Sequence, residues 1–378
     1  MDILISGASI AGPALAHWLT RYGHTVTVVE RAPAVRPGGQ AVDFKGATHR
    51  TVLDRMGILD AVLARQTGGH DQTIIDAAGR PRAVIPGEFT GGEIEIRRGD
   101  LAEILYAHTD CEYLFGDTIT SLTETANGVD VTFAHAAPRR FDLVAGADGI
   151  HSTVRRLAFG PERDHVQYLG YHYALAEFGD GFGEPVMYNE PGRMVAVGGP
   201  KASAFFVFAS PELGYDRTDT EQQRKLLADA YLGAGWRVPD LMAKLPDSRE
   251  FYFDSLSRVT IDRYSAGRVV LLGDAAYGNT LGGFGTGLAV VGAYVLAGEL
   301  LAAGGDHRVA FARYEDQLRG YARIAQRGSA GPFLAPPSKL RIRLRDWTFR
   351  SRFLLGLLLK ATDRFATDIE LTDYASGS

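Results

Sequence analysis

Apolar runs alternate with glycine-rich turns at the start of the chain. The run "ILIS" is followed by a turn from Gly7 to Gly12, and "PALAHWLTRYG" then shows the spacing of a helix that ends at Gly23. Residues 25–30, "TVTVVE", are rich in β-branched side chains and end on Glu30. The pattern predicts a strand, a helix and a second strand, which is a βαβ unit complete by residue 30.

Two later segments have the same strand-then-turn pattern. In "FDLVAGADGIHSTVRR" an apolar run leads into Gly146, Asp148 and Gly149. In "GRVVLLGDAAYGNTLGGFGTGLAVVGAYVLAGELL" an apolar run leads into Gly273 and Asp274, then into a glycine-rich loop and a long apolar helix. Both segments place an aspartate at the carboxyl end of a strand, where open α/β sheets bind their ligands.

The segments between these motifs have a different pattern. Residues 70–96 and 165–255 contain short alternating runs separated by glycine and proline, which predicts a mostly antiparallel sheet. We therefore expect an α/β fold in which 1–69, 97–164 and 256–330 form one nucleotide-binding domain, and 70–96 and 165–255 form a sheet domain that binds substrate. Residues 331–378 predict a linker and one or two helices with a basic side, which brace the two domains or, alternatively, lie on a membrane surface.

Composition and charge exclude several classes of protein. The 378 residues carry a formal charge of −5 without a basic face, which argues against a nucleic-acid partner. Cys111 is the single cysteine and lacks the companions that a disulfide or a zinc site needs. The apolar stretch "FLLGLLLK" is far shorter than the roughly 20 residues of a membrane span. Since Asp2 leads straight into a strand, with no leader pattern, we expect a cytoplasmic protein.

The first turn has the chemistry of a dinucleotide site. Gly7 permits a tight turn, Gly12 lets the helix lie close to the strand, and the N-terminus of the helix favours a pyrophosphate. Ser9 replaces the usual middle glycine, but it is small and its hydroxyl can bind a phosphate. Glu30 lies close to the offset of about 20 residues expected for the acid that binds a ribose diol. The alternative is a purely structural βαβ turn.

Together, the N-terminal turn, GADGxxSxVR and GDAA resemble the FAD-dependent aromatic-hydroxylase-type monooxygenases, the flavoproteins typified by para-hydroxybenzoate hydroxylase. The three motifs occur in the family order over roughly residues 1–330. The segments "ERAPAVRPGGQAVDF" and "EIRRGDLAEIL" are similar to those of the small tetracycline-inactivating monooxygenases and their relatives in antibiotic pathways. The resemblance implies a Rossmann-like FAD domain of the glutathione-reductase type, interleaved with the sheet domain and followed by a C-terminal helix.

The resemblance also implies roles for particular residues. It assigns the FAD pyrophosphate to the first turn, the adenosine ribose to Glu30, the ADP portion to Arg31, and the pyrophosphate or ribityl chain to Arg98. Asp274 would bind ribityl hydroxyls, Asp148 would serve both FAD and the nicotinamide cofactor, and Arg36 and Asp43 would lie near the flavin and the reductant. The full set of expected FAD residues is Gly7, Ser9, Ile10, Ala11, Gly12, Glu30, Arg31, Arg36, Asp43, Arg98, Asp148, Gly273, Asp274, Gly283, Gly285 and Thr286.

The loop "GGFGTG" precedes a helix whose N-terminus would stabilise negative charge at the N1–C2=O edge of a reduced flavin. Gly283, Gly285 and Thr286 are the residues expected there. The sequence departs from the family at this loop, because Tyr277 stands where the family has histidine and the usual proline is missing.

A second G-x-G-x-x-G unit is missing from the sequence, and in this family that implies transient binding of NADPH or NADH. Oxidation by molecular oxygen through a flavin C4a-hydroperoxide would follow, with a small aromatic or polyketide-like substrate and non-covalent FAD. No acid or base can be assigned, since the protein chiefly positions the substrate and excludes water. Candidates for substrate contact in the sheet domain are Tyr171, His172, Tyr173 and Tyr188.

Two other functions fit the same motifs. One is an FAD-dependent reductase of the same fold, and the other is a non-catalytic flavin- or ligand-binding protein. A flavin halogenase fits less well, because the W-x-W-x-I-P signature is absent and the three tryptophans stand alone.

Overall fold

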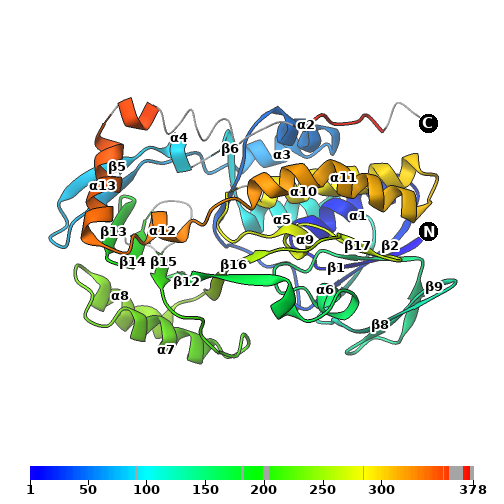
Figure 1. Ribbon diagram of the computed structural model, residues 1–378, viewed down its shortest axis with the longest axis horizontal. Coiled ribbons are helices and arrows are strands. Elements are labelled where there is room, and N and C mark those ends of the chain that lie inside the picture. The colour runs from blue at the N-terminus through cyan, green and yellow to red at the C-terminus, as the bar shows by residue number, and fades with distance from the viewer. Residues whose placement is uncertain are drawn as a thin grey trace.

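The structure is a computed structural model that describes the chain except for residues 91, 180–182, 199–203, 284, 352, 357–368 and 375–378. Two large sheets lie at opposite ends of an elongated molecule (Figure 1). One is a mainly parallel sheet near the N-terminus, and the other is a seven-stranded sheet built from the middle of the chain. The mixed α/β fold predicted from the sequence is confirmed.

The parallel sheet has the strand order β17-β18-β11-β1-β2-β7, and only β17 runs antiparallel to its neighbour. Strand β1 lies inside the sheet between β2 and β11, which explains why residues 3–5 are apolar and fully buried. The bounds are β1 Asp2–Ser6, β2 Thr25–Glu30, β7 Glu112–Phe115, β11 Leu143–Gly146, β17 Ser265–Ala266 and β18 Val269–Leu271.

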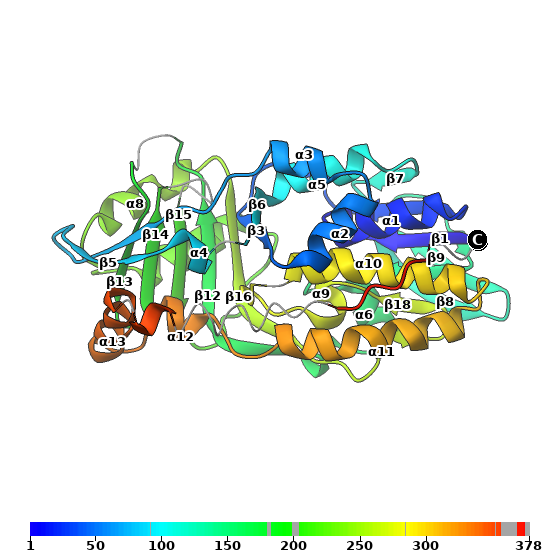
Figure 2. The same ribbon diagram turned by 90° about the horizontal axis from the view of Figure 1, so that it is seen from above.

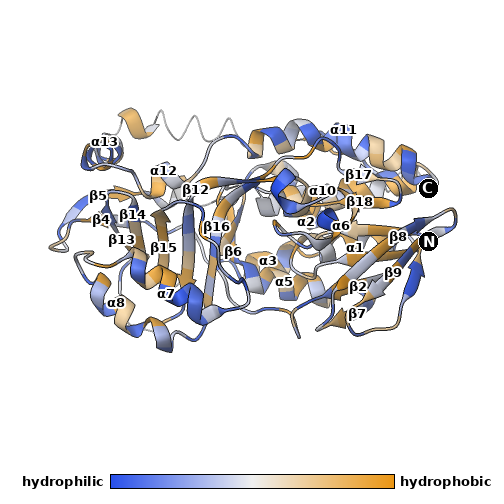
Figure 3. Ribbon diagram, turned by 60° about the horizontal axis from the view of Figure 1, so that its bottom comes forward, coloured by the Kyte–Doolittle hydropathy of each residue, from blue (hydrophilic) through white to orange (hydrophobic). Residues whose placement is uncertain are grey.

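Helices α1 (Ala11–Arg21), α10 (Gly285–Ala302) and α11 (His307–Ala325) pack beside this sheet (Figure 2). Helix α10 has no polar face because it is buried between α1 and α11. Among the described helices it is the one long and apolar enough to cross a membrane, yet 78% of that stretch is buried inside the protein. Helix α11 is amphipathic, with hydrophilic and hydrophobic bands along its length (Figure 3).

The second sheet has the order β16-β12-β15-β14-β13-β4-β5, and β13 and β4 are its one parallel pair among the described strands. The predicted mostly antiparallel sheet is confirmed. Helices α7 (Thr220–Ala230) and α8 (Val238–Lys244) pack on one face, and α12 (Gly331–Leu334) and α13 (Lys339–Arg350) pack on the other. The strands are β4 Gln72–Ile75, β5 Pro81–Ile85, β12 Val166–Ala176, β13 Val186–Glu190, β14 Arg193–Val197, β15 Ala204–Ala209 and β16 Phe251–Val259.

Smaller elements complete the fold. Strands β3 and β6 pair in a two-stranded sheet, and β8, β9 and β10 form a three-stranded one. These strands are β3 Ala41–Phe44, β6 Ile94–Arg97, β8 Ile119–Thr125, β9 Gly128–Phe133 and β10 Arg139–Phe141. The remaining helices are α2 Ala47–Arg55, α3 Leu59–Ala64, α4 Gly87–Thr90, α5 Arg98–Ala107, α6 Thr153–Ala158 and α9 Asp274–Tyr277, with 3₁₀ turns at Glu162–Asp164 and Leu245–Asp247.

The C-terminal segment, for which the sequence predicts a linker and one or two helices, contains α12 and α13. Residues 357–368 and 375–378 of that segment lie outside the described part of the chain. Residues 369–374 lie back against the parallel sheet's helices. Thr48 of α2 donates to the carbonyl of Ile369, and Tyr294 of α10 donates to the carbonyl of Thr372 at 2.6 Å. The segment therefore contacts both halves of the molecule.

Candidate functional site

The first turn leaves no room for side chains at Gly7 and Gly12, the two glycines of its motif. Gly7 has φ +106°, and a Cβ there would lie 2.4 Å from the carbonyl oxygen of Ala147. A Cβ on Gly12 would lie 1.8 Å from the carbonyl oxygen of Gly7. Helix α1 begins directly after Ile10, which caps it without a side-chain hydrogen bond. Its first N–H groups are therefore suited to bind an anion such as a pyrophosphate.

Glu30 holds this turn together from the end of β2. Its carboxylate accepts hydrogen bonds from the backbone N–H of Ala8 and of Ala32, both at 2.8 Å. Each oxygen keeps a second lone pair, so the same carboxylate can still accept from a ribose hydroxyl. Arg31 and Arg36 follow in an exposed loop, where the structure gives them open access to solvent.

Ser9 contacts Arg98, which the resemblance to the family also assigns to FAD. The Arg98 guanidinium donates to the Ser9 hydroxyl across 3.0 Å, although 89 positions separate the two residues. Arg98 is the first residue of α5 and is half-buried. The serine that replaces the middle glycine thus holds a cationic group beside the N-terminus of α1. Two sources of positive potential meet at the expected position of the pyrophosphate.

Asp274 lies where its own turn meets the start of α1 and the start of α10. Gly273 has φ +64°, and a Cβ there would lie 3.1 Å from the Cβ of Ala11, so this turn packs against the start of α1. A Cβ on Gly285, the first residue of α10, would lie 3.4 Å from Oδ1 of Asp274. The Gly273–Asp274 turn therefore lies against the start of α1, and its carboxylate lies beside the start of α10.

Asp274 is exposed to solvent but surrounded by protein atoms. The protein around it raises the pKa of the carboxyl by desolvation, and Arg98 acts in the opposite direction. Gly283 is exposed with φ +87°, and Thr286 is half-buried at the start of α10. The loop before α10 thus borders the same space. Asp43 is half-buried in β3, directly opposite Glu95 of β6.

Asp148 has a structural use that the sequence did not indicate. Its carboxylate accepts from the backbone N–H groups of Thr153 and Val154, at 2.8 and 3.1 Å, and from the Ser152 hydroxyl. It therefore stabilises the start of α6. Buried Arg155 donates to the carbonyl of Ala275 at 2.9 Å and so ties α6 to α9. The GADGxxSxVR motif therefore fastens the turn at Asp148 to the helix α9 that follows Gly273.

The four aromatic and histidine candidates in the sheet lie on opposite faces. Tyr171 and Tyr173 lie in the cluster that includes Phe349 of α13, whereas Tyr188 lies in the cluster with α7 and α8. His172 is 1% exposed and stacks between Phe208 and Phe253, and burial lowers its pKa to about 4. His172 and Tyr188 are thus packed within the sheet domain, and we do not assign them to substrate contact.

Tyr173 lies on the face of the seven-stranded sheet opposite Tyr188. The charges of Arg98 and Asp274 are among the influences on the pKa of its phenol. Burial raises the pKa of Tyr173 well above its usual range. The phenol consequently stays neutral and can donate a hydrogen bond to a ligand.

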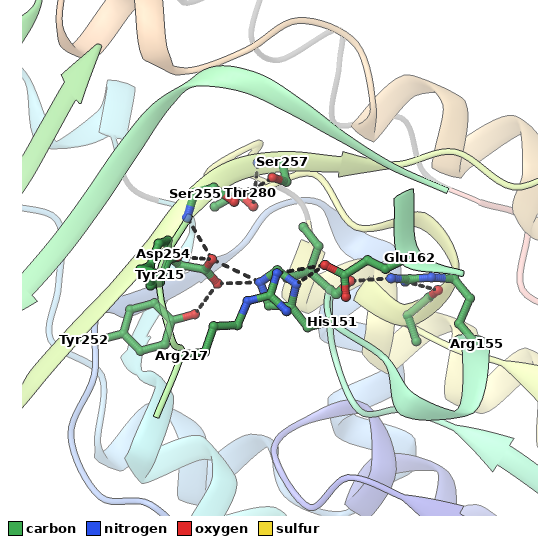
Figure 4. A network of polar contacts seen from close by, with 12 residues as sticks. His151, Arg155, Glu162, Tyr215, Arg217, Tyr252, Asp254, Ser255, Ser257 and Thr280 are labelled. Atoms are coloured by element: carbon green, nitrogen blue, oxygen red, sulfur yellow. Dashed lines mark hydrogen bonds and ion pairs between the residues drawn. The ribbon is translucent and has the colours of Figure 1, made fainter. Parts of the chain in front are cut away.

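A network of ion pairs beside the site was not predicted (Figure 4). His151 contacts Glu162 through Nδ1 and Asp254 of β16 through Nε2, both at 3.0 Å. Burial lowers the pKa of His151, but its hydrogen bonds to the two carboxylates outweigh this effect, and the pKa is raised. Burial likewise opposes ionisation of Glu162, yet His151 and Arg217 bring its pKa down to about 2. The His151 ring therefore lies between two carboxylates that favour its protonated form.

The network joins the two halves of the molecule. Asp254 also accepts from the Tyr252 hydroxyl at 2.9 Å. The Tyr252 ring in turn packs against the Tyr173 ring, with centroids 5.6 Å apart. The sequence showed His151 only as an unspecified position of a motif, and its partner Asp254 is 103 residues away, so spacing alone could not reveal the contact.

A family model described as FAD binding domain matches residues 1–317. This chain belongs to that family. It is 41% identical to an uncharacterized protein, Rv1260, of Mycobacterium tuberculosis over 84% of this chain and 90% of the relative. It is 35% identical to a flavin-dependent monooxygenase of Legionella longbeachae, covering 86% of this chain and 87% of the relative. Our chain is thus an FAD-dependent monooxygenase of this family.

The solved structure of tetracycline destructase Tet(51) is similar to this chain over almost its whole length. The TM-score is 0.82 at 30% identity, with 99% of this chain and 98% of that one covered. The family assignment agrees with the geometry, because the glycine turn, the uncapped helix, Arg98 and Asp274 together fit a dinucleotide with a polyol chain. Those residues would bind the FAD.

Proposed function

We propose that this flavoprotein is a monooxygenase that uses NADPH or NADH and molecular oxygen to hydroxylate or oxidise a small cyclic, aromatic or polyketide-like metabolite. The observation that carries the proposal is the convergence of the glycine turn, the Ser9–Arg98 contact and Asp274 in a chain of the FAD-binding family. A seven-stranded sheet that covers the bound cofactor would shield the place where a substrate meets it. The names of the similar proteins support this substrate class, since Tet(51) is a tetracycline destructase.

FAD bound in this site would supply the redox chemistry, and the chain's own residues have simpler tasks. Arg98, Ser9 and the N-terminus of α1 bind the pyrophosphate, and Asp274 orients a hydroxylated chain. The N-terminus of α10 faces the same region and favours negative charge there. Tyr173 remains protonated and donates to the substrate, while the apolar sheet face around it excludes water.

Oxygen labelling decides between this proposal and a reductase of the same fold. Purified enzyme, NADPH and ¹⁸O₂ would be incubated with a panel of phenolic and polyketide compounds, and products would be analysed by mass spectrometry. We expect a product that carries one heavy oxygen atom. A saturated product without new oxygen, or one labelled only from water, would contradict the monooxygenase proposal. A chain that binds FAD but neither oxidises NADPH nor forms product would be a binding protein.

A further inference from the structure

The outward side of helix α13 carries only two kinds of exposed side chain. Leu340, Leu344 and Trp347 are 75%, 58% and 58% exposed. The other exposed residues of the helix are all basic, namely Lys339, Arg341, Arg343 and Arg350. Exposure of large apolar side chains to water is unfavourable. Isolated cases are common on protein surfaces, but three in one helix form a patch.

These residues are arranged in rows. Leu340, Leu344 and Trp347 follow the spacing i, i+4, i+7 and so form one apolar stripe along the helix. At 3.6 residues per turn, Lys339, Arg343 and Arg350 fall on one side of the stripe. Arg341 falls on its other side. The exposed surface is therefore an apolar stripe with cations on both flanks.

The inner side of α13 fixes this surface in place. Phe349 is 6% exposed and packs against Phe89 and Phe333, with ring centroids 5.2 and 6.0 Å away. Buried Arg345 donates to the side-chain oxygen of Asn189 in β13 at 2.9 Å. Ser338 caps the helix by accepting from the N–H of Arg341. The stripe therefore belongs to a docked helix at the end of the molecule farthest from the N-terminus (Figures 1 and 2).

We propose that α13 docks this enzyme on an anionic lipid surface. In this arrangement the stripe enters the boundary between headgroups and acyl chains, with Trp347 at the level where indole rings are favoured. The flanking lysine and arginines extend along the stripe and place their charges at lipid phosphates. A second copy of the chain fits the face poorly, because it would oppose four cations with four cations.

The test uses full-length holoenzyme and vesicles. Co-flotation would be measured with vesicles of phosphatidylglycerol and phosphatidylcholine, and with vesicles of phosphatidylcholine alone. We expect binding to the anionic vesicles that weakens with added salt, together with a blue shift of tryptophan fluorescence. The double variant Leu344→Glu/Trp347→Glu should bind at least tenfold more weakly, and Arg341→Glu/Arg343→Glu should lose the dependence on anionic lipid.

Leu232→Glu is the matched control, because Leu232 is 73% exposed but lies outside α13. It should bind vesicles as the wild type does. FAD content and thermal stability should stay unchanged in every variant, since all the altered side chains are exposed. Absence of binding to anionic vesicles, or equal binding by the stripe variant, would refute the proposal. So would a dimer in light scattering that the stripe variant converts to monomer, because the face would then bind a second copy.

Discussion

At the residue scale, the first turn keeps the two glycines that its backbone geometry requires, although Ser9 replaces the middle glycine of the motif. Gly7 and Gly12 are required by the close approach of backbone atoms, and both were predictable from the motif. The contact of Ser9 with Arg98 was not, because hydrogen bonds between residues 89 positions apart leave no local pattern. Asp148 shows the opposite case. Its motif was visible, yet its carboxylate is largely used by the start of α6.

Arg98→Ala should weaken FAD binding. A charge-assisted hydrogen bond is worth roughly 1.5 to 3 kcal/mol, or about one to two decades of affinity. Asp274→Ala should have an effect of similar size. Ser9→Gly removes the contact with Arg98 but keeps the guanidinium, so its loss should be smaller. Fluorescence titration of the apoprotein with FAD measures all three, and wild-type affinity in both alanine variants would refute the assignment.

Tyr173→Phe should separate cofactor reduction from product formation. The variant loses the neutral hydroxyl that we assign to the substrate, but it retains the ring that fills the sheet face. NADPH oxidation should continue, with less product per NADPH and more hydrogen peroxide, while FAD affinity stays the same. Tyr188→Phe, on the opposite face, is the control. Unchanged coupling in Tyr173→Phe would remove this residue from the substrate site.

At the scale of elements, periodicity predicted strands and helices well but not the contacts between their ends. Helix α10 was predicted from its long apolar run, yet it contains Glu299, which is 5% exposed. Oε1 of this carboxylate accepts from Gln317 of α11 at 2.6 Å and from Tyr374 at 2.7 Å. The partner in the C-terminal segment could not be foreseen, because a single tyrosine carries no periodic signal.

Tyr374→Phe should lower the free energy of unfolding by about 1 to 3 kcal/mol, since it removes a hydrogen bond from a buried carboxylate. Urea denaturation followed by circular dichroism would give the value. Tyr106→Phe provides a matched control, because Tyr106 is 41% exposed and its change should cost little. An equal effect of the two substitutions would show that the Glu299 contact contributes nothing specific.

At the scale of the whole molecule, two sheets that the sequence predicted separately are joined by His151. The motif before α6 belongs to the parallel sheet, and Asp254 belongs to the edge strand of the seven-stranded sheet. The sequence predicted both sheets because each has its own hydrophobic pattern. It could not predict how they meet, since that depends on charged side chains brought together only by the complete fold.

The His151 contacts should make stability depend on pH. The folded pKa of His151 is raised, so its contribution is fully present below about pH 6.5 and is lost as pH rises through the folded pKa. The pKa of Glu162 is lowered to about 2, so its contribution is present above roughly pH 4.5 and is lost on acidification. The stability difference between wild type and His151→Gln should therefore be largest between about pH 5 and 6.5.

Urea unfolding of both proteins across the pH range tests this expectation. His135→Gln serves as the control, because the His135 side chain lies outside the network. The wild type should lose its advantage over His151→Gln toward alkaline pH. A difference that stays constant from neutral to alkaline pH would mean that the imidazolium does not stabilise the junction.

The strand order of the parallel sheet also sets the order in which the chain can fold during translation. Strand β1 leaves the ribosome first, yet its neighbour β11 is made only at residues 143–146, and β18 only at 269–271. Five of the seven strands of the other sheet, β12 to β16, are synthesised between those two strands. Until then the edge of β11 that pairs with β18 has no partner, and its backbone N–H and C=O groups can pair with other chains. Slow elongation or chaperone capture in this interval should therefore govern the yield of soluble enzyme more strongly than the stability of the finished fold.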